Sequence, residues 1–327
     1  MKALITGITG FAGSHLADLL LSKGEEVAGT VYAEGIENVE HLRGRVRLIP
    51  CDIRRTEEVR RIVAEERPDR LYHLAAIASV QESLERPGKA MEVNLLGTWN
   101  LLETARALKK ARVLVVSSGD VYGAGGRDDS PHREESPLRP LNPYAASKAA
   151  AEMLAYQYAK GFDLPVVRVR PFNHTGPRQR PQFVCSDIAR QLVCIERGLQ
   201  EPVLKVGNLT VRRDFSDVRD VVEGYWLALE RGEVGEVYNL CSGRAYAIEE
   251  LVELLVKRAG LDVKVHQEEV KLRSHDIPIL VGDPGRFKRL TGWEVKIPIE
   301  RTLQDLLDFW RSRPLTPTLS PLGRGNG

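Results

Sequence analysis

The stretch Leu4–Leu20, LITGITGFAGSHLADLL, joins a short apolar run to a longer amphipathic one through Gly7, Gly10 and Gly13. Glycines at a strand-to-helix junction allow a tight turn, and they let backbone N–H groups and the helix N-terminus approach a pyrophosphate. A glycine triplet alone is weak evidence, but this one follows the first predicted strand of the chain. We therefore predict a dinucleotide-binding loop rather than a plain turn.

Apolar and amphipathic segments continue to alternate as far as Pro171. Continuous apolar strands separated by helices indicate a parallel sheet covered on both faces, so we predict an α/β fold with a doubly wound Rossmann sheet. Residues 1–171 should form this NAD(P)-binding domain. Residues 172–312 should form mainly a smaller substrate lobe, with some elements returning to the main sheet, and 313–327 should be a disordered tail. For the second half we predict helices near 183–197, 217–231 and 247–259, and strands near 203–206 and 236–240.

The composition of the 327-residue chain is that of an ordinary globular protein, with 43% hydrophobic and 28% charged residues. A formal net charge of +2 gives no reason to expect a nucleic-acid or membrane partner. No apolar run is long enough to span a bilayer and the N-terminus lacks a signal-like core, so we expect a cytoplasmic protein. The four cysteines form no CxxC pair, and no cluster has metal-ligand spacing, so we expect no metal.

The ends of the second and third predicted strands give a further cofactor signal. Asp52, in CDIRR, follows the third strand and could meet an adenine ring. The second strand ends at Val31 and Tyr32, where an NAD site usually offers a carboxylate and an NADP site an arginine. Because no carboxylate stands there to repel a 2′-phosphate, the pocket should tolerate NADP. Arg43 or Arg45 could assist, although each is more simply interpreted as a solvated charge.

The segment Asn142–Leu154, NPYAASKAAAEML, places Tyr144 and Lys148 one turn apart on a predicted helix. Alone, this pair is interpreted as a half-buried tyrosine and a snorkelling lysine. Together with Ser118 in VVSSGDVYG, with the GxxGxxG loop, and with HLAA and EVNLLGT in register, the pair resembles the active site of the extended short-chain dehydrogenase/reductases that act on nucleotide sugars. The resemblance covers roughly residues 1–312.

This resemblance implies NADP or NAD as the cofactor, with its reduced form as the hydride donor. The ammonium of Lys148 should lower the pKa of Tyr144, because a nearby positive charge favours the phenolate. The resemblance further implies that Ser118 hydrogen-bonds the reacting sugar oxygen, while Tyr144 gives its proton to the C4 oxygen as hydride arrives. The implied cofactor-binding residues are Gly7, Thr9, Gly10, Phe11, Ala12, Gly13, Tyr32, Asp52, Ile53, Leu74, Ala75, Ala76, Asn94, Tyr144, Lys148 and Pro171.

Three segments of the second half resemble the substrate lobe of enzymes that handle GDP-deoxyhexoses: RPFNHTGPRQRPQFV, LKVGNLTVRRDFSDVRDVVEGYW and LRSHDIPILVGDPGRFKRLTGW. The implied partner is a GDP-sugar, whose diphosphate suits arginine and lysine. The helices expected near 91–109 and 143–161 resemble the family's four-helix interface, which implies a homodimer. The implied substrate-binding residues are Ser79, Ser118, Asn173, Val184, Lys205, Arg213, Arg273 and Asp276.

The residues after the serine distinguish two reactions within this family. Sugar 4,6-dehydratases carry Thr-Asp-Glu or Thr-Ser-Glu there, whereas this chain carries Ser118, Gly119 and Asp120. GFAG in place of GQDG and FNHTGP in place of FNHES depart from the dehydratases in the same way. We therefore predict NAD(P)H-dependent reduction of the C4 ketone of GDP-4-keto-6-deoxy-D-mannose to GDP-D-rhamnose, with Asp120 as a further catalytic candidate. A GDP-mannose 4,6-dehydratase, another nucleotide-sugar 4-epimerase or 4-reductase, and a non-catalytic nucleotide-sugar sensor are the alternatives.

Overall fold

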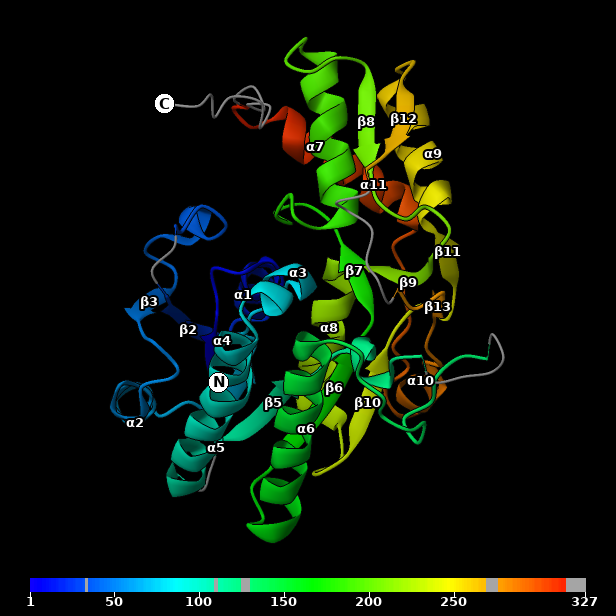
Figure 1. Cartoon of the computed structure of the whole chain (residues 1–327). Helices are drawn as coiled ribbons and strands as arrows, with labels where there is room; N and C mark the ends of the chain where they lie inside the picture. Colours follow the sequence, from blue (N-terminus) through cyan, green and yellow to red (C-terminus); the bar gives the residue numbers. More distant parts are fainter. Residues whose placement is uncertain (33–34, 109–110, 125–129, 269–275, 316–327) are drawn as a thin grey trace, which may run out of the picture.

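The computed structural model describes residues 1–32, 35–108, 111–124, 130–268 and 276–315. At its centre lies a seven-stranded parallel sheet in the order β10-β6-β5-β4-β1-β2-β3 (Figure 1), which confirms the predicted doubly wound fold. The strand order reverses between β1 and β4, and ligands of such sheets bind at the carboxyl edge of this reversal. The strands are β1 (Lys2–Thr6), β2 (Glu26–Val31), β3 (Arg47–Pro50), β4 (Arg70–His73), β5 (Arg112–Val116), β6 (Val166–Pro171) and β10 (Val237–Leu240).

Helices cover both faces of this sheet, as its continuous apolar strands require. Successive residues of β1 point to opposite faces, so that Ile5 joins one hydrophobic core and Leu4 the other. The first face packs against α1 (Phe11–Ser22), α8 (Val218–Arg231) and α10 (Gly285–Thr291). The second face packs against α2 (Thr56–Glu66), α5 (Gly97–Leu108) and α6 (Pro143–Gly161). In the described ranges no helix has the length and apolar character needed to cross a membrane.

The second half of the chain builds a smaller lobe and also returns to the main sheet. β10, α8 and α10 come from this half and complete one edge and one face of the sheet (Figure 1). Each helix and strand predicted for this half begins and ends within one residue of its predicted bounds. The lobe contains β7 (Asn173–Thr175), α7 (Val184–Glu196), β8 (Val203–Val206), β9 (Arg212–Asp217), β11 (Ala245–Ala247), α9 (Ile248–Ala259), β12 (Lys264–Gln267), β13 (Ile279–Leu280) and α11 (Ile299–Arg311).

A buried polar network ties α6 to the sheet. The Glu152 carboxylate of α6 is fully buried and accepts hydrogen bonds from Arg168 and Arg170 of β6. Arg170 also donates to the hydroxyl of Tyr122, which in turn donates to Asn239 of β10 at 2.7 Å. Buried charges are tolerated when they are paired and hydrogen-bonded, which explains two arginines in an otherwise apolar interior strand.

The beginning of the predicted tail packs on the smaller lobe. The carbonyl oxygen of Arg313 accepts a hydrogen bond from Arg197, and the Arg313 guanidinium lies over the ring of Phe309, 4.5 Å from its centroid. Leu315 packs against the hydrophobic core of the lobe. The remainder of the predicted tail, 316–327, lies outside the described residues.

Candidate active site

The glycine loop forms a tight turn at the strand-order reversal. Gly7 has a φ of 75°, and a Cβ atom there would lie 2.9 Å from the Cα of Ala75, which follows β4. A Cβ atom on Gly13 would collide with the carbonyl oxygen of Gly7. α1 starts after Gly10, which has no side chain to cap the first N–H groups of the helix. These backbone donors and this close approach fit the pyrophosphate of a dinucleotide.

The second half of the chain contacts the start of α1, next to this loop. The ring of Phe11 stacks on the imidazole of His174, with centroids 5.8 Å apart, and Asp18 pairs with Arg178 at 2.7 Å. The predicted cofactor loop is therefore in contact with the segment that leads into the smaller lobe. The other residues predicted near the cofactor in this region lie in or beside the turns that follow β1, β3, β4 and β6: Thr9, Ala12, Ile53, Leu74, Ala76 and Pro171.

Arg54 connects the ends of β2 and β3 and is not among the site residues predicted from the sequence. Its Nε and Nη2 atoms donate to both carboxylate oxygens of Asp52, at 3.0 and 2.7 Å, and Nη2 also donates to the Tyr32 hydroxyl at 3.1 Å. Arg43, which the sequence interpretation considered instead, is exposed and pairs with Glu40. Arg54 stands in the quoted CDIRR motif, but nothing in the motif shows that its side chain returns to Tyr32.

The side chain of Asn94 is fully used inside the protein. It lies in the π-helical turn η2 (Glu92–Leu96), is buried, and accepts a hydrogen bond from the N–H of Ile77 at 2.8 Å. Its amide nitrogen donates to the Ile77 carbonyl and to the Ser147 hydroxyl. Asn94 therefore fixes the segment after β4 against α6, beside Lys148, and its side-chain groups are engaged in doing so.

Ser118, Tyr144 and Lys148 come together where β5 ends against the first turns of α6. The Ser118 hydroxyl accepts a hydrogen bond from the N–H of Asp120 at 3.2 Å and hydrogen-bonds the phenol of Tyr144. The Nζ atom of Lys148 donates to the carbonyl oxygen of Val116 at 2.7 Å. The structure thus brings the predicted reactive groups into one cluster at the carboxyl edge of the sheet.

The surroundings of this cluster shift two pKa values in opposite directions. Burial raises the pKa of Tyr144, the carboxylate of Asp120 raises it further, and the hydrogen bond with Ser118 opposes both. Burial lowers the pKa of Lys148 from 10.5 to about 8. The prediction that Lys148 lowers the pKa of Tyr144 is therefore wrong for this arrangement, because the ammonium is turned to the Val116 carbonyl.

Gly119, between Ser118 and Asp120, lies under an aromatic ring. A Cβ atom at this position would lie 2.9 Å from the ring of Phe172, which is itself buried. A side chain here would require Phe172 to move. Gly119 opens the short 3-10 turn η3 (Gly119–Tyr122), in which Asp120 is the second residue.

The predicted substrate residues lie on several elements. The guanidinium of Arg213, on β9, donates to the Ile277 carbonyl at 2.6 Å and lies 4.0 Å from the carboxylate of Asp276. Lys205, on β8, pairs instead with Glu268 at 3.2 Å. The structure therefore brings Arg213 and Asp276 together, and Arg273 lies outside the described residues.

Three other predicted substrate residues occupy element boundaries. Asn173 begins β7 and is paired with Phe215 of β9, two residues from Arg213. Val184 is the first residue of α7. Ser79 caps α3 (Val80–Glu85) by accepting a hydrogen bond from the N–H of Glu82 at 3.2 Å, so its hydroxyl already has a structural role.

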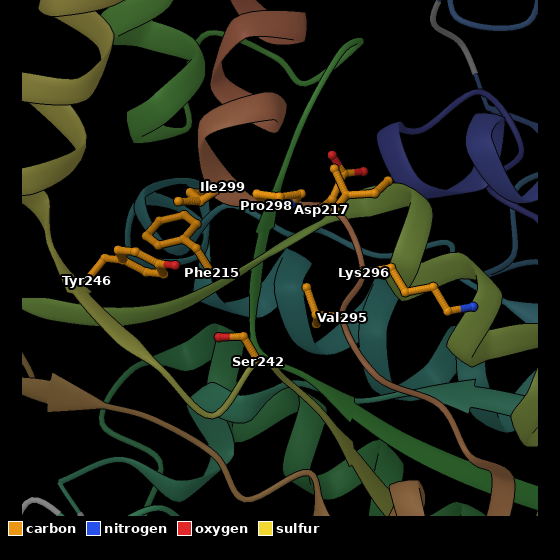
Figure 2. Close-up of a pocket in the computed structure, with 9 residues that line it drawn as sticks. Phe215, Asp217, Ser242, Tyr246, Val295, Lys296, Pro298 and Ile299 are labelled. Atoms are coloured by element: carbon orange, nitrogen blue, oxygen red, sulfur yellow. The ribbon is translucent and has the colours of Figure 1, made fainter.

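A cavity of about 200 Å³ lies elsewhere in the smaller lobe (Figure 2). Phe215 and Asp217 of β9 line it, together with Tyr246 and the segment 295–299. The Asp217 carboxylate already accepts hydrogen bonds from Thr302 and Arg219. None of the predicted site residues lines this cavity, so its shape gives no support to the predicted site. Among the described residues no three His, Cys, Asp or Glu side chains are placed to hold a metal.

Comparisons with known proteins agree with the resemblance predicted from the sequence. A family model described as GDP-mannose 4,6 dehydratase matches residues 4–306. GDP-6-deoxy-D-mannose reductase of Pseudomonas aeruginosa is 37% identical over 313 residues, which cover 95% of this chain and 98% of that protein. GDP-mannose 4,6 dehydratase 1 of Arabidopsis thaliana is 30% identical over 321 residues, which cover 94% and 88%. The structure of RMD from Pseudomonas aeruginosa complexed with NADPH matches with a TM-score of 0.82 and 35% identity, covering 95% of this chain and 99% of that one.

The lowered pKa of Lys148 predicts a pH-dependent effect on stability. Near pH 7 the folded chain holds a charged ammonium whose pKa is about 8 instead of 10.5, which lowers the unfolding free energy by up to about 3 kcal/mol. Between these two values the folded state loses the proton before the unfolded state does, so the cost shrinks as pH rises. We therefore expect Lys148→Met to stabilise the protein near pH 7 by up to about 3 kcal/mol, and by less near pH 9.5.

Urea denaturation of wild type and variant at the two pH values measures this difference. Lys160→Met, at the exposed end of the same helix, is the matched control and should show no such pH dependence. An equal effect of Lys148→Met at both pH values would show that the pKa of Lys148 is not lowered in the folded protein.

Proposed function

The chain belongs to the GDP-mannose 4,6 dehydratase family, and we propose that within this family the protein is a reductase. Its substrate is the C4 ketone of GDP-4-keto-6-deoxy-D-mannose, its product is GDP-D-rhamnose, and its hydride donor is NADPH or NADH. The observation that carries the proposal is Gly119, packed under Phe172 between Ser118 and Asp120. Elimination of water across C5 and C6 needs acid-base groups besides the tyrosine, and this glycine supplies none.

Comparison with the relatives also favours a reductase over a dehydratase. The Pseudomonas aeruginosa reductase shares 37% of its residues with this chain over nearly its whole length, and the Arabidopsis thaliana dehydratase shares 30%. The structure of RMD contains NADPH, which supports a nicotinamide dinucleotide at the glycine loop of this chain.

The proposed reaction assigns one task to each group of the cluster. When bound, the reduced nicotinamide supplies the hydride. The raised pKa of Tyr144 keeps the phenol protonated at neutral pH, so Tyr144 is the proton donor to the C4 oxygen. The Ser118 hydroxyl, which hydrogen-bonds the phenol of Tyr144, can turn its O–H to that oxygen when the substrate is bound. The ammonium of Lys148, held on the Val116 carbonyl, has further N–H groups for the nicotinamide ribose.

We place the nucleotide of the substrate against the smaller lobe. Arg213 is mostly buried, and its side chain is held by the Ile277 carbonyl beside Asp276. A guanidinium fixed in this way can form paired hydrogen bonds with a diphosphate. Lys205 is half exposed and can add charge from the neighbouring strand.

A dehydratase is the second candidate, because Asp120 places a carboxylate close enough to raise the pKa of Tyr144. Purified protein given GDP-4-keto-6-deoxy-D-mannose with NADPH or NADH should oxidise the cofactor and form a product heavier by two hydrogens. GDP-mannose alone should remain unchanged. The absorbance of the dihydronicotinamide and mass spectrometry of the sugar nucleotide measure both outcomes.

Loss of water from GDP-mannose without net cofactor change would establish the dehydratase instead. An epimerase would reveal itself by NAD that stays bound through purification and is released on denaturation.

Tyr144→Phe should lower kcat by about 10²- to 10⁴-fold, because the ring remains while the proton donor is lost. The dissociation constant of NADPH, measured by fluorescence titration, should stay within about twofold. Tyr156→Phe on the exposed side of the same helix is the matched control and should retain wild-type turnover. Near-normal kcat in Tyr144→Phe would remove this residue from the mechanism.

We also propose that the protein is a homodimer through η2, α5 and α6. Leu96 and Trp99 of one segment and Met153 of the other are 45% to 49% exposed, which is unusual for large apolar side chains gathered on adjacent helices. Leu96→Glu should convert the dimer to a monomer in light scattering after gel filtration. Val265→Glu, at an equally exposed position on β12, should leave the mass unchanged. A monomeric wild type would exclude the interface.

A further inference from the structure

At the ribose end of the predicted dinucleotide site, the described residues that end β2 and follow it directly, Val31 and Tyr32, do not include the usual selectivity residue. In sheets of this kind a carboxylate after the second strand binds the ribose hydroxyls of NAD, or a nearby arginine accommodates the 2′-phosphate of NADP. Tyr32 follows β2 in this chain, 52% exposed, and provides neither group. Among the described residues, another side chain must therefore distinguish the two dinucleotides.

Arg54 is the cation that the fold brings to this place. Its Nη2 atom donates to the Tyr32 hydroxyl at 3.1 Å, and its guanidinium carbon lies 5.7 Å from the centre of the Tyr32 ring. The side chain of Arg54 is 31% exposed, so a bound nucleotide can reach it. Arg43, by contrast, pairs with Glu40 beyond the second strand and is 67% exposed.

The contacts of Arg54 leave part of its guanidinium available. Nε and Nη2 are held by the two oxygens of Asp52, which fixes the plane of the group. Nη1 has a long contact of 3.4 Å with Glu92, whose side chain is 55% exposed. A phosphate oxygen can replace this weak contact while Asp52 keeps the guanidinium in position.

We propose that Arg54 is the residue that selects NADPH over NADH, by binding the 2′-phosphate with Nη1 while Asp52 and Tyr32 hold the guanidinium. The inference rests on the proposed function, because it presumes a dinucleotide at the glycine loop. A 2′-phosphate gains a charge-assisted hydrogen bond from Arg54, whereas the 2′-hydroxyl of NADH gains at most a neutral acceptor contact. Arg54 therefore contributes to the affinity for NADPH and hardly to the affinity for NADH.

Direct binding of NADPH and NADH to the full-length chain, followed by dihydronicotinamide fluorescence, tests this proposal without requiring turnover. Wild type should bind NADPH at least about tenfold more tightly than NADH. Arg54→Ala should weaken NADPH binding by about tenfold or more and change NADH binding by less than about twofold. Arg54→Lys keeps the charge but not the planar guanidinium, so its NADPH affinity should lie between those of wild type and Arg54→Ala.

Arg55→Ala is the matched control, because Arg55 is the neighbouring arginine, is 72% exposed and pairs with Glu58. It should leave both dissociation constants unchanged. A wild type that prefers NADH, or an Arg54→Ala variant that weakens both dinucleotides equally or neither, would overturn the role of Arg54 while leaving the proposed reductase intact. A wild type that binds neither dinucleotide would overturn both. Unchanged thermal melting of Arg54→Ala without nucleotide shows that its effect is on binding.

Discussion

The carboxylate of Glu152 is shared by two buried arginines of β6, and the placement of the reactive groups depends on this charge cluster. α6 carries Tyr144 and Lys148, and Glu152 fixes this helix to the sheet one turn beyond Lys148. Arg170 also donates a hydrogen bond to Tyr122, which ends the turn that begins after Ser118. Removing one partner of such a buried network leaves an uncompensated charge, so the parts of the cluster can hardly shift independently.

Much of this arrangement is predictable from sequence, because its determinants are local. The glycine loop, the alternation of apolar and amphipathic segments, and the four-residue spacing of Tyr144 and Lys148 are each contained in a single short stretch. The predicted sheet and the bounds of the second-half elements were accordingly correct. The cluster of Ser118, Tyr144 and Lys148 follows from this sheet, because β5 ends and α6 begins at its carboxyl edge.

What could not be predicted depends on partners distant in sequence. Arg54 is an ordinary surface arginine in its own segment, and only the contact between the ends of β2 and β3 brings it to Tyr32. The pKa of Tyr144 depends on how deeply the phenol is enclosed and on Asp120, neither of which the YxxxK pattern contains. Asn94 is similar: its motif predicts a polar residue near the cofactor, whereas its hydrogen bonds to Ile77 and Ser147 appear only once α6 has docked.

β10 pairs with the outer edge of β6 but follows part of the smaller lobe in the sequence, and this order affects how the sheet forms during synthesis. When a ribosome has released the chain as far as Pro171, six strands of the sheet exist but the outer edge of β6 has no neighbour. An open edge of apolar strand can pair with another nascent chain. The sheet is completed only after Leu240 emerges, by which time β7, α7, β8 and β9 of the smaller lobe have also been synthesised. Completion of the main sheet therefore depends on prior synthesis of part of the smaller lobe.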